Sequence, residues 1–553
     1  MTAPAGFRSV AVLGAGTMGA QIAAHLANAG VPALLLDVTA DAARDGLTRA
    51  RALKPDPFFT ADTASLITTG AFDDDLSRLS KVDWVIEAVV ERIDIKRALL
   101  ERVDTVRRPG TVVTSNTSGI PIAALAEGRS EDFKRHWLGT HFFNPPRYLR
   151  LLEVIPTTDT HVAVVQRITS FADHRLGKGV VIAKDTPNFI ANHIGLYGVA
   201  QVLRALQSGQ YTIEEIDAIT GPALGRPKSA TFRTMDIAGI DVLAHVARNL
   251  TLELPPLISA LVERGWVGEK AGQGFYKRDP ATKEILTLDP ATMTYRPKQP
   301  ARLPSLEAAR SIEDAGGRIK TLFLGRDKVG QFLRDTLAPT LVYTARVAPD
   351  IAYSIDDVDR AMQWGFGWQF GPFETLDAIG PHDALGEVFP QGHTRFREDG
   401  VPPAGPDLLI LKSAKDRQRV LRRNSGASLV DLGDGVLAVE FHSKMNAIGG
   451  DTVQMLDAGV KEAAANFAAL VVGNDAANFS AGANQMLVLL EAQEGNWDEI
   501  DLMIRAFQNS TQALRDADVP VVVAPAGLTL GGGCEIALHG DRVQASAESY
   551  IGL

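Results

Sequence analysis

Three glycines with the spacing Gly14-x-Gly16-x-x-Gly19 follow an apolar run near the start of the chain. In such a motif the first glycine permits a tight turn, the second lets the backbone approach a pyrophosphate, and the third allows close helix–strand packing. A second apolar run ends at Asp37, about 20 residues further on, where an acid accepts hydrogen bonds from a ribose and repels a 2′-phosphate. The sequence therefore predicts a site for NAD rather than NADP, with a glycine-rich turn of another α/β protein as the alternative.

His141 and Glu153 are the residues best suited to acid–base chemistry. The alternation in LRLLEVI (149–155) places Glu153 on an apolar face of a strand, where a carboxylate is costly unless a partner compensates it. A carboxylate that holds an imidazole fixes its tautomer and makes it a better general base near neutral pH. From local sequence alone, a histidine that simply packs in the core remains the alternative for His141.

The elements that must position these side chains are strands that alternate with helical stretches. This order predicts a mostly parallel, doubly wound α/β sheet, in which ligands bind beyond the carboxyl ends of the strands. Glu91, Ser118 and His141 are expected at such ends. The predicted strands after Asp37 are 82–91, 111–118, 137–146, 149–155 and 179–185.

With 553 residues, the chain is long enough for three or four domains, and its composition is typical of a globular protein. Its net charge of −10 argues against nucleic acid or an anionic membrane as a general partner. The single cysteine, Cys534, fits a reducing compartment, and the longest uncharged run (519–534) is broken by prolines and glycines. We therefore expect a cytoplasmic chain without a signal peptide or transmembrane segment, and we predict no metal site.

Further motifs follow the glycine turn in a fixed order and resemble those of the NAD-dependent L-3-hydroxyacyl-CoA dehydrogenases. They span residues 8 to about 280 and are Ser115-Asn116-Thr117-Ser118, His141-Phe142-Phe143-Asn144-Pro145, Glu153, Asp185-Thr186-Pro187 and Gly272-x-Gly274-Phe275-Tyr276. Asn188 departs from the glycine usual in that family, which would alter the start of the next helix.

The resemblance implies a role for each matching residue. His141 would take the proton from the substrate 3-hydroxyl as hydride leaves C3 for the nicotinamide, and Glu153 would orient His141. Ser118 and Asn192 would hydrogen-bond near the reacting oxygen and the thioester; without the family context, Asn192 could equally lie on a solvated helix surface. The implied cofactor-binding residues are Gly14, Gly16, Thr17, Met18, Gly19, Asp37, Glu91, Lys96 and Asn144.

An internal repeat follows, in which residues 211–239 parallel residues 353–380. The matching pairs are Tyr211 and Tyr353, Asp217 and Asp359, Asp236 and Asp377, and Gly239 and Gly380. The repeat resembles the duplicated C-terminal helical domain of larger dehydrogenases. We therefore predict a Rossmann-type NAD-binding domain (1–185), helical copy 1 (186–300) and helical copy 2 (301–420), with copy 2 structural and 278–303 a linker or small hairpin.

The last segment, 426–553, differs in composition and follows a proline-rich linker at 398–407 and a basic stretch at 415–424, interpreted as a solvated helix. Two glycine loops each follow a buried strand and open a helix, so they could aim N–H groups at one oxyanion. Three pieces resemble the crotonase (enoyl-CoA hydratase/isomerase) superfamily, namely Met445-Asn446-Ala447, Phe479-Ser480-Ala481-Gly482-Ala483 and Gly531-Gly532-Gly533-Cys534-Glu535.

That second resemblance implies that Ala483 and Gly532 donate the oxyanion-hole N–H pair and that Glu535 is an acid/base. Cys534 is interpreted as a core residue. The superfamily's second catalytic glutamate would follow a segment like Ser549–Leu553, where the chain stops. We therefore expect an incomplete crotonase-like α/β domain and a poor hydratase, with hydratase and isomerase chemistry both left open.

The combined prediction is a β-oxidation enzyme with a complete L-3-hydroxyacyl-CoA dehydrogenase and a fused, truncated enoyl-CoA hydratase. Acyl-CoA thioesters are the expected substrates, and association with a thiolase is left open. One alternative is a dehydrogenase of another hydroxyacid on the same fold. A second is a non-catalytic NAD-binding protein of that fold.

Overall fold

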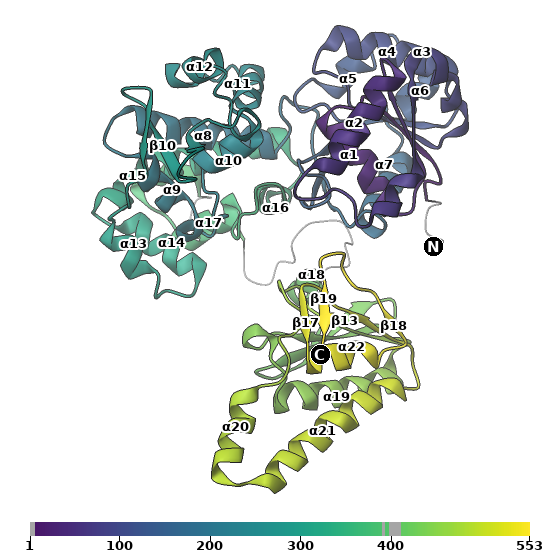
Figure 1. The fold of residues 1–553 in the computed structure, drawn as a ribbon, viewed down its shortest axis with the longest axis vertical. Helices are drawn as coiled ribbons and strands as arrows, with labels where there is room; N and C mark the ends of the chain where they lie inside the picture. The colour runs from purple at the N-terminus through teal and green to yellow at the C-terminus, as the bar shows by residue number, and fades with distance from the viewer. Residues whose placement is uncertain (1–5, 390–392, 398–410) are drawn as a thin grey trace. The chain divides into compact units, whose positions relative to one another are not determined.

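The computed structural model describes residues 6–389, 393–397 and 411–553. The chain divides into two compact units, Met1–Asp399 and Gly400–Leu553, and each unit has a hydrophobic core of its own. Both units appear in Figure 1. The predicted linker at 398–407 lies outside the described residues.

The first unit begins with an eight-stranded sheet in the order β3-β2-β1-β4-β5-β6-β7-β8. All neighbouring strands are parallel except β6 and β7, which confirms the predicted doubly wound α/β sheet. Its strands are β1 (Val10–Leu13), β2 (Ala33–Asp37), β3 (Ile67–Ala71), β4 (Trp84–Glu87), β5 (Val112–Ser115), β6 (Trp137–Phe142), β7 (Leu151–Pro156) and β8 (Gly179–Ile182). Its helices are α1 (Thr17–Asn28), α2 (Ala40–Ala52), α3 (Phe72–Asp75), α4 (Ile93–Val106), α5 (Ile122–Leu125), α6 (Glu131–Arg135) and α7 (Val162–His174).

Strand β4 ends at Glu87, so the prediction that this strand runs to Glu91 was wrong. The chain turns because the carboxylate of Glu87 accepts a hydrogen bond from the N–H of Val89 at 2.7 Å. A further turn, closed by the N–H of Arg92 on the carbonyl of Val90, leads into α4. Glu91 therefore lies in the loop between β4 and α4.

The alternation predicted for β7 is confirmed. Leu151 and Ile155 belong to one hydrophobic core, and Leu152 and Val154 belong to the core on the other face of the sheet. Glu153 shares the face of Leu151 and Ile155 by the period of two. That core is continuous with the core of the helical part of the unit. Glu153 therefore points from the sheet toward the helices.

The helical part contains two sets of helices joined by a small sheet. The first set is α8 (Ala191–Gln207), α9 (Ile213–Thr220), α10 (Phe232–Ala238), α11 (Ile240–Asn249) and α12 (Pro256–Glu263). The second set is α13 (Pro304–Ala309), α14 (Ala315–Leu324), α15 (Lys328–Ile351), α16 (Ile355–Phe366) and α17 (Pro372–Ile379). The long helices α8 and α15 pack together, with the rings of Tyr197 and Tyr343 parallel and 3.8 Å apart.

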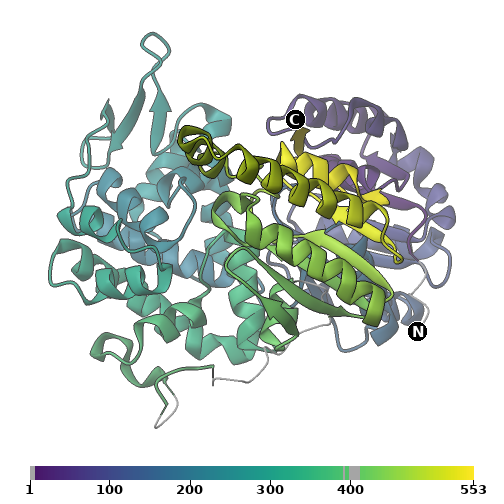
Figure 2. The ribbon, with the colours of Figure 1, turned by 90° about the horizontal axis from the view of Figure 1, so that it is seen from below.

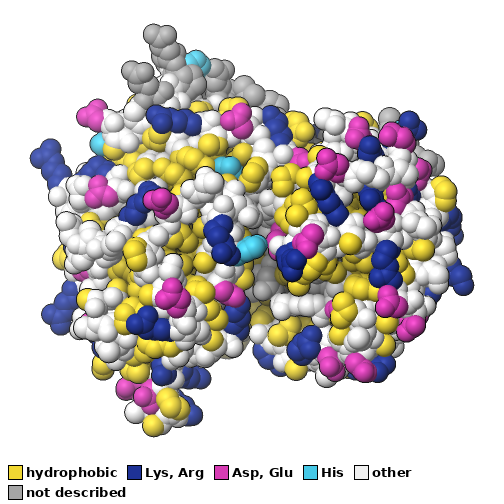
Figure 3. Space-filling model, turned by 90° about the horizontal axis from the view of Figure 1, so that it is seen from above, with side chains coloured by type: hydrophobic (Ala, Val, Ile, Leu, Met, Phe, Trp, Pro, Cys, Tyr) yellow, Lys and Arg dark blue, Asp and Glu magenta, His cyan; other side chains and the backbone are white. Residues whose placement is uncertain are grey.

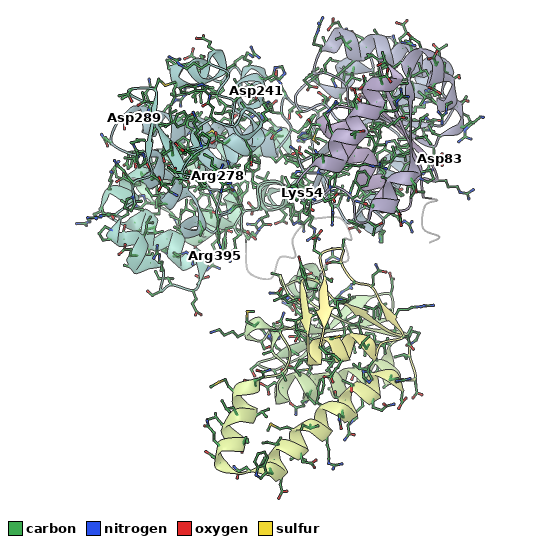
Figure 4. The ribbon with its side chains drawn as sticks, in the orientation of Figure 1. Lys54, Asp83, Asp241, Arg278, Asp289 and Arg395 are labelled. Carbon is green, nitrogen blue, oxygen red and sulfur yellow. The ribbon has the colours of Figure 1, made fainter. Side chains whose placement is uncertain are left out.

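The segment predicted as a linker or small hairpin forms a three-stranded antiparallel sheet in the order β11-β10-β9. Its strands are β9 (Tyr276–Arg278), β10 (Ile285–Asp289) and β11 (Thr294–Pro297). Arg278 and Asp289, labelled in Figure 4, mark the ends of β9 and β10.

The sequence repeat corresponds to a repeated hydrogen-bonding pattern. Asp217 on α9 accepts the N–H groups of Thr231 and Phe232, at 3.0 and 2.8 Å, where α10 begins. Its counterpart Asp359 on α16 accepts the N–H groups at the start of α17 in the same way. Each aspartate thus ties one helix of its copy to the N-terminus of the next, where the helix dipole favours negative charge.

A second aspartate in each copy ties down a returning segment. Asp236 accepts the N–H groups of Phe275 and Tyr276, and Asp377 accepts those of Phe396 and Arg397. Tyr276 and Arg397 then reach back to Asp217 and Asp359, the first aspartates of the two copies. Burial raises the pKa of Asp217 and of Asp236 to about 6, and that of Asp359 to about 7, against the hydrogen bonds that lower it.

The second unit is built on a six-stranded sheet in the order β12-β13-β14-β15-β16-β18 and a two-stranded sheet of β17 and β19. Figure 2 shows α19 and α21, which pack together. The strands are β12 (Val420–Arg423), β13 (Ala427–Gly433), β14 (Val436–Phe441), β15 (Ala469–Gly473), β16 (Val521–Ala524), β17 (Leu528–Leu530), β18 (Arg542–Val543) and β19 (Tyr550–Gly552). The helices are α18 (Leu411–Asp416), α19 (Gly450–Asn466), α20 (Gln485–Glu494), α21 (Trp497–Arg515) and α22 (Gly532–Leu538).

The basic stretch at 415–424 is not the single helix that we predicted. Helix α18 ends at Asp416, and residues 420–423 form strand β12, which pairs with β13 at the edge of the sheet. Arginines on an edge strand discourage pairing with another chain. None of the helices in the described residues is long and apolar enough to span a membrane.

Tyr276→Phe should destabilise the first unit more than Tyr295→Phe. The hydroxyl of Tyr276 donates to the buried carboxylate of Asp217 at 2.6 Å, whereas that of Tyr295 donates to a neutral carbonyl at 2.7 Å. We expect the free energy of unfolding to fall by about 1.5–3 kcal/mol in the first variant and about 0.5–1.5 kcal/mol in the second. Denaturant unfolding of both variants measures this difference, and equal losses would contradict the proposed role of Asp217.

Candidate active site

The glycine turn between β1 and α1 leaves open space beside the backbone. Gly14 has φ +103°, and a Cβ added there would lie 2.7 Å from the carbonyl oxygen of Ala88. A Cβ on Gly19 would lie 1.8 Å from the carbonyl oxygen of Gly14, so α1 packs directly on the turn. Gly16 has nothing within 4 Å of its Cβ position. Since α1 begins at Thr17, the open side of Gly16 adjoins a helix N-terminus that favours a pyrophosphate.

Asp37 stands at the end of β2, next to this turn. Its carboxylate accepts the N–H of Ala15 and the N–H of Val38, each at 2.7 Å. These two bonds fix the carboxylate beside the glycines while leaving it half-buried rather than enclosed. The residues present therefore fit the diphosphate and ribose of a dinucleotide.

Lys96 on α4 is a buried cation between two glutamates. Its Nζ lies 2.8 Å from Oε1 of Glu87 and 3.2 Å from Oε2 of Glu91, and it also donates to the carbonyl of Val89. Its side chain is only 1% exposed. Lys96 therefore positions Glu91 instead of reaching solvent. Glu87 was missed from the sequence, although an acid in an apolar strand followed by a lysine on the next helix is a usable signal.

Glu91 organises the loop that carries Ser118. One of its carboxylate oxygens accepts the N–H groups of Ser118 and Gly119 and the hydroxyl of Thr117. Burial alone would raise the pKa of Glu91, but the Lys96 charge and these hydrogen bonds lower it. Glu91 is therefore an ionised anchor for the loop after β5.

His141 and Glu153 face each other directly across the antiparallel pair β6–β7. Nδ1 of His141 lies 2.7 Å from Oε2 of Glu153, and Nε2 lies 3.1 Å from Oγ of Ser118. The other Glu153 oxygen accepts the N–H groups of Ile190 and Ala191 at the start of α8. Because Glu153 engages Nδ1, the ring presents Nε2 to Ser118 and to whatever lies beside it.

The strand that carries His141 is tied to the dinucleotide turn. Asn144, just beyond β6, accepts a hydrogen bond from Nε2 of Gln21 on α1 at 3.1 Å. Gln21 was not predicted, and only its place two residues after Gly19 would have suggested a part in the site. The segment just after the strand of His141 is therefore joined by a hydrogen bond to the helix that follows the glycine turn.

Asn188 explains how α8 begins. It has φ +63°, a left-handed conformation that glycine adopts freely and asparagine tolerates. Its buried amide donates to the carbonyl of Val246 at 3.0 Å. The hydrogen bond to Val246 thus stabilises asparagine at this position, and the N–H groups of Ile190 and Ala191 still donate to Glu153.

A cavity of about 210 Å³, partly open to solvent, extends from Ser118 and Asn192 into the helical part. Asn192, in the first turn of α8, is half-buried and lines this cavity, so it does not lie on a solvated helix surface. Residues of the second copy, including Phe332, Phe366 and Trp368, line it as well. Copy 2, which we predicted to be structural, therefore also contributes to the wall of this cavity. On the face shown in Figure 3, acidic and basic side chains are interspersed among hydrophobic ones.

In the second unit, the two glycine loops contact each other. Gly482 has φ +96°, and a Cβ added there would lie 3.7 Å from Cα of Gly531. Ala483 and Gly532 are the next residues of the two loops, and Gly532 opens α22. Glu535, on the same helix, is exposed, and Cys534 is buried as predicted. Several apolar side chains on α20 and α21 are also exposed.

Comparison with known proteins places this geometry in a family. Residues 9–186 match the 3-hydroxyacyl-CoA dehydrogenase NAD binding domain, and residues 189–278 and 330–416 match the C-terminal domain of that family. A probable 3-hydroxyacyl-CoA dehydrogenase of Bacillus subtilis is 42% identical over 604 residues, which cover 99% of this chain and 76% of the relative.

The chain belongs to the 3-hydroxyacyl-CoA dehydrogenase family. The cofactor of its first domain is NAD, as predicted. A putative fatty acid oxidation complex trifunctional enzyme of Rickettsia felis is 27% identical over 580 residues, covering 99% of this chain and 78% of the relative. The crystal structure of Mycobacterium tuberculosis FadB2 is 32% identical, covers 50% of this chain and all of that chain, and has a TM-score of 0.45.

The 3-hydroxyacyl-CoA dehydrogenase fold should depend on Lys96. Lys96→Met leaves the fully buried carboxylate of Glu87 without its cation, so we expect the free energy of unfolding to fall by about 3–5 kcal/mol. Lys134→Met, which breaks an exposed pair with Glu131, is the matched control and should change it by less than about 0.5 kcal/mol. Denaturant midpoints that coincide for wild type and Lys96→Met would contradict this account.

Proposed function

We propose that the first unit oxidises the 3-hydroxyl of a 3-hydroxyacyl-CoA thioester to the ketone, with His141 as the general base. The observation that carries this proposal is the position of the imidazole, which lies between a buried carboxylate on Nδ1 and the Ser118 hydroxyl on Nε2. A histidine that only filled the core would not need Nε2 directed at Ser118, a residue that lines a cavity together with Asn192.

The roles of the side chains follow from this arrangement. NAD⁺, when bound, supplies the hydride acceptor. Nε2 of His141 takes the hydroxyl proton while the C3–H bond gives up its hydrogen as hydride. Glu153 keeps the proton of Nδ1 in place and stabilises the imidazolium that forms. Ser118 hydrogen-bonds the reacting oxygen, and Asn192 orients the thioester.

The two alternatives are less well supported. A dehydrogenase of small free hydroxyacids would need a charged group close to Ser118 for the acid, whereas the one charged residue that the structure describes in the lining of this cavity, Arg226, stacks on Trp368 of the second copy. A non-catalytic NAD-binding protein would not require a hydrogen-bonded series from Glu153 through His141 to Ser118, beside a cavity that Ser118 and Asn192 line. Turnover decides between the last alternative and the enzyme.

We further propose that the chain acts in the cytoplasm and passes its 3-oxoacyl-CoA product to a thiolase. Its proposed domains are residues 1–185, 186–300, 301–420 and 426–553.

For the second unit we propose that the N–H groups of Ala483 and Gly532 bind the thioester oxygen of an enoyl-CoA, with Glu535 as acid/base. The contact between Gly482 and Gly531 supports this part. Crotonyl-CoA hydration that is unchanged in Glu535→Gln would exclude Glu535 from that role.

His141→Gln should abolish NADH formation from 3-hydroxybutyryl-CoA, because glutamine cannot accept the hydroxyl proton. Glu153→Gln should lower kcat by about 10²- to 10⁴-fold, because the imidazolium loses its counter-charge. NAD binding should change little in either variant, and a direct binding titration is the control. Activity retained in His141→Gln would remove His141 from the mechanism.

Asp37→Ser should weaken the preference for NAD. The variant loses the charge that repels a 2′-phosphate and one ribose acceptor, so the NAD/NADP ratio of kcat/KM should fall by about 10- to 100-fold. Asp41→Ser, which changes an exposed acid on α2, is the control and should leave the ratio unchanged. An unaltered ratio in Asp37→Ser would show that this carboxylate does not read the ribose.

A further inference from the structure

Arg226 is a cation on the wall of an otherwise mainly apolar cavity. It follows the short 3₁₀ turn Pro222–Leu224 and lines the same cavity as Ser118 and Asn192. Its guanidinium carbon lies 3.8 Å from the ring centroid of Trp368, so the two groups are stacked. Burial lowers the pKa of Arg226 to about 10.

The internal duplication builds this pair. Gly225 and Gly367 lie at equivalent positions of the two copies and both adopt the left-handed conformation, with φ +66° and φ +67°. The next residues, Arg226 and Trp368, are therefore equivalent and stack on each other. The N–H of Gln369 donates to the carbonyl of Gly225 at 2.7 Å, which joins the two loops. The duplicated fold is thus symmetric here while its side chains are not.

In the part of the chain that the structure describes, no carboxylate forms an ion pair with Arg226. Among the described residues, the guanidinium of Arg226 forms no hydrogen bond and no ion pair. Its contact with a side chain is the stacking on the ring of Trp368. The buried aspartates of the two copies are already engaged, Asp217 by Tyr276 and Asp359 by Arg397. A half-buried charge without a counter-charge is costly, so this position favours a ligand that brings one.

The stacked pair is connected to the catalytic histidine by a series of rings. The rings of Trp368 and Phe366 are 6.5 Å apart, and Phe366 is 6.5 Å from Phe143, which is 4.6 Å from the His141 ring. Gly195 on α8 makes room for Phe366, because a Cβ there would lie 2.6 Å from that ring. The cavity itself is lined by Ser118, which hydrogen-bonds His141, and by Arg226, and its walls are otherwise mainly apolar.

We propose that this cavity binds the acyl chain of a substrate whose far end carries a carboxylate, which the guanidinium of Arg226 recognises. The substrate class is then the CoA thioester of a 3-hydroxy dicarboxylic acid. This inference rests on the proposed dehydrogenase function and adds the identity of the acyl tail. A carboxylate can accept two hydrogen bonds from one guanidinium, and Trp368 holds the guanidinium plane in place.

A phosphate of CoA offers the same anionic chemistry to Arg226. The carboxylate is favoured because a single cation among apolar side chains suits one small charged end of a chain. A nucleotide diphosphate would need several polar partners. Thioesters of pantetheine separate the two sources, since they lack every phosphate of CoA and keep the acyl end.

The test compares kcat/KM for pairs of equal length, such as 3-hydroxyadipyl-CoA against 3-hydroxyhexanoyl-CoA, and the same pairs at eight and ten carbons. We expect a preference of about 10- to 100-fold for the carboxylate end at one or more lengths. Arg226→Gln should lose that preference while keeping its activity on the methyl-ended partner. Arg233→Gln, which breaks an exposed pair with Glu269, is the matched control and should keep the preference.

A wild-type enzyme without preference at any length would overturn the proposal, whether or not Arg226→Gln folds. An equal loss of kcat/KM for both kinds of acyl end that disappears with pantetheine thioesters would assign Arg226 to a CoA phosphate and also overturn the proposal. Failure of the dehydrogenase function itself would appear as no NADH from any thioester. In that case the affinities of adipyl-CoA and hexanoyl-CoA, measured by calorimetry, test the carboxylate site on their own. Equal affinities would contradict it.

Discussion

The structure of the first unit depends on how the carboxylate of Glu153 is satisfied. This side chain is fully buried, so leaving it without partners would cost several kcal/mol. It meets the imidazole of His141 across a strand pair and the first N–H groups of α8. One carboxylate therefore fixes the orientation of the imidazole and the point at which the helical part joins the sheet. Because Asn192 lies in the first turn of that helix, the same contact also sets the position of one residue that lines the cavity.

The sequence was sufficient wherever a local pattern has a local physical cause. The glycine turn, the alternation around Glu153 and the paired aspartates of the repeat were all predicted, because each reflects a steric or hydrogen-bonding demand within a short segment. The end of β4 was predicted wrongly because the chain turns where the Glu87 carboxylate accepts the N–H of Val89. The hydrophobicity of the segment gives no sign of this hydrogen bond. Lys96 was assigned to the cofactor, yet its ammonium is enclosed by two glutamates. The sequence offers one signal of this pairing, the acid Glu87 in an apolar strand before the helix that carries Lys96.

The contribution of the second copy could not be read from sequence, since it depends on how two similar units pack. Each copy keeps the same framework of aspartates on helix N-termini and a glycine in the left-handed conformation. Outside this framework the side chains of the two copies differ. One such difference lies in the wall of the cavity, where Arg226 of one copy stacks on Trp368 of the other. A duplication within one chain frees each copy to change alone, which two identical subunits cannot do. The asymmetric pair is a direct product of that freedom.

The central claim is that Nε2 of His141 receives the proton of the substrate hydroxyl beside the glycine turn. A crystal structure of the chain with NAD⁺ and a 3-oxoacyl-CoA tests it most directly. The account predicts the 3-oxygen within about 2.6–3.2 Å of Nε2, with C3 about 3–3.5 Å from the nicotinamide carbon that accepts hydride. A ternary complex with the 3-oxygen directed away from His141, or with the nicotinamide remote from it, would contradict the account.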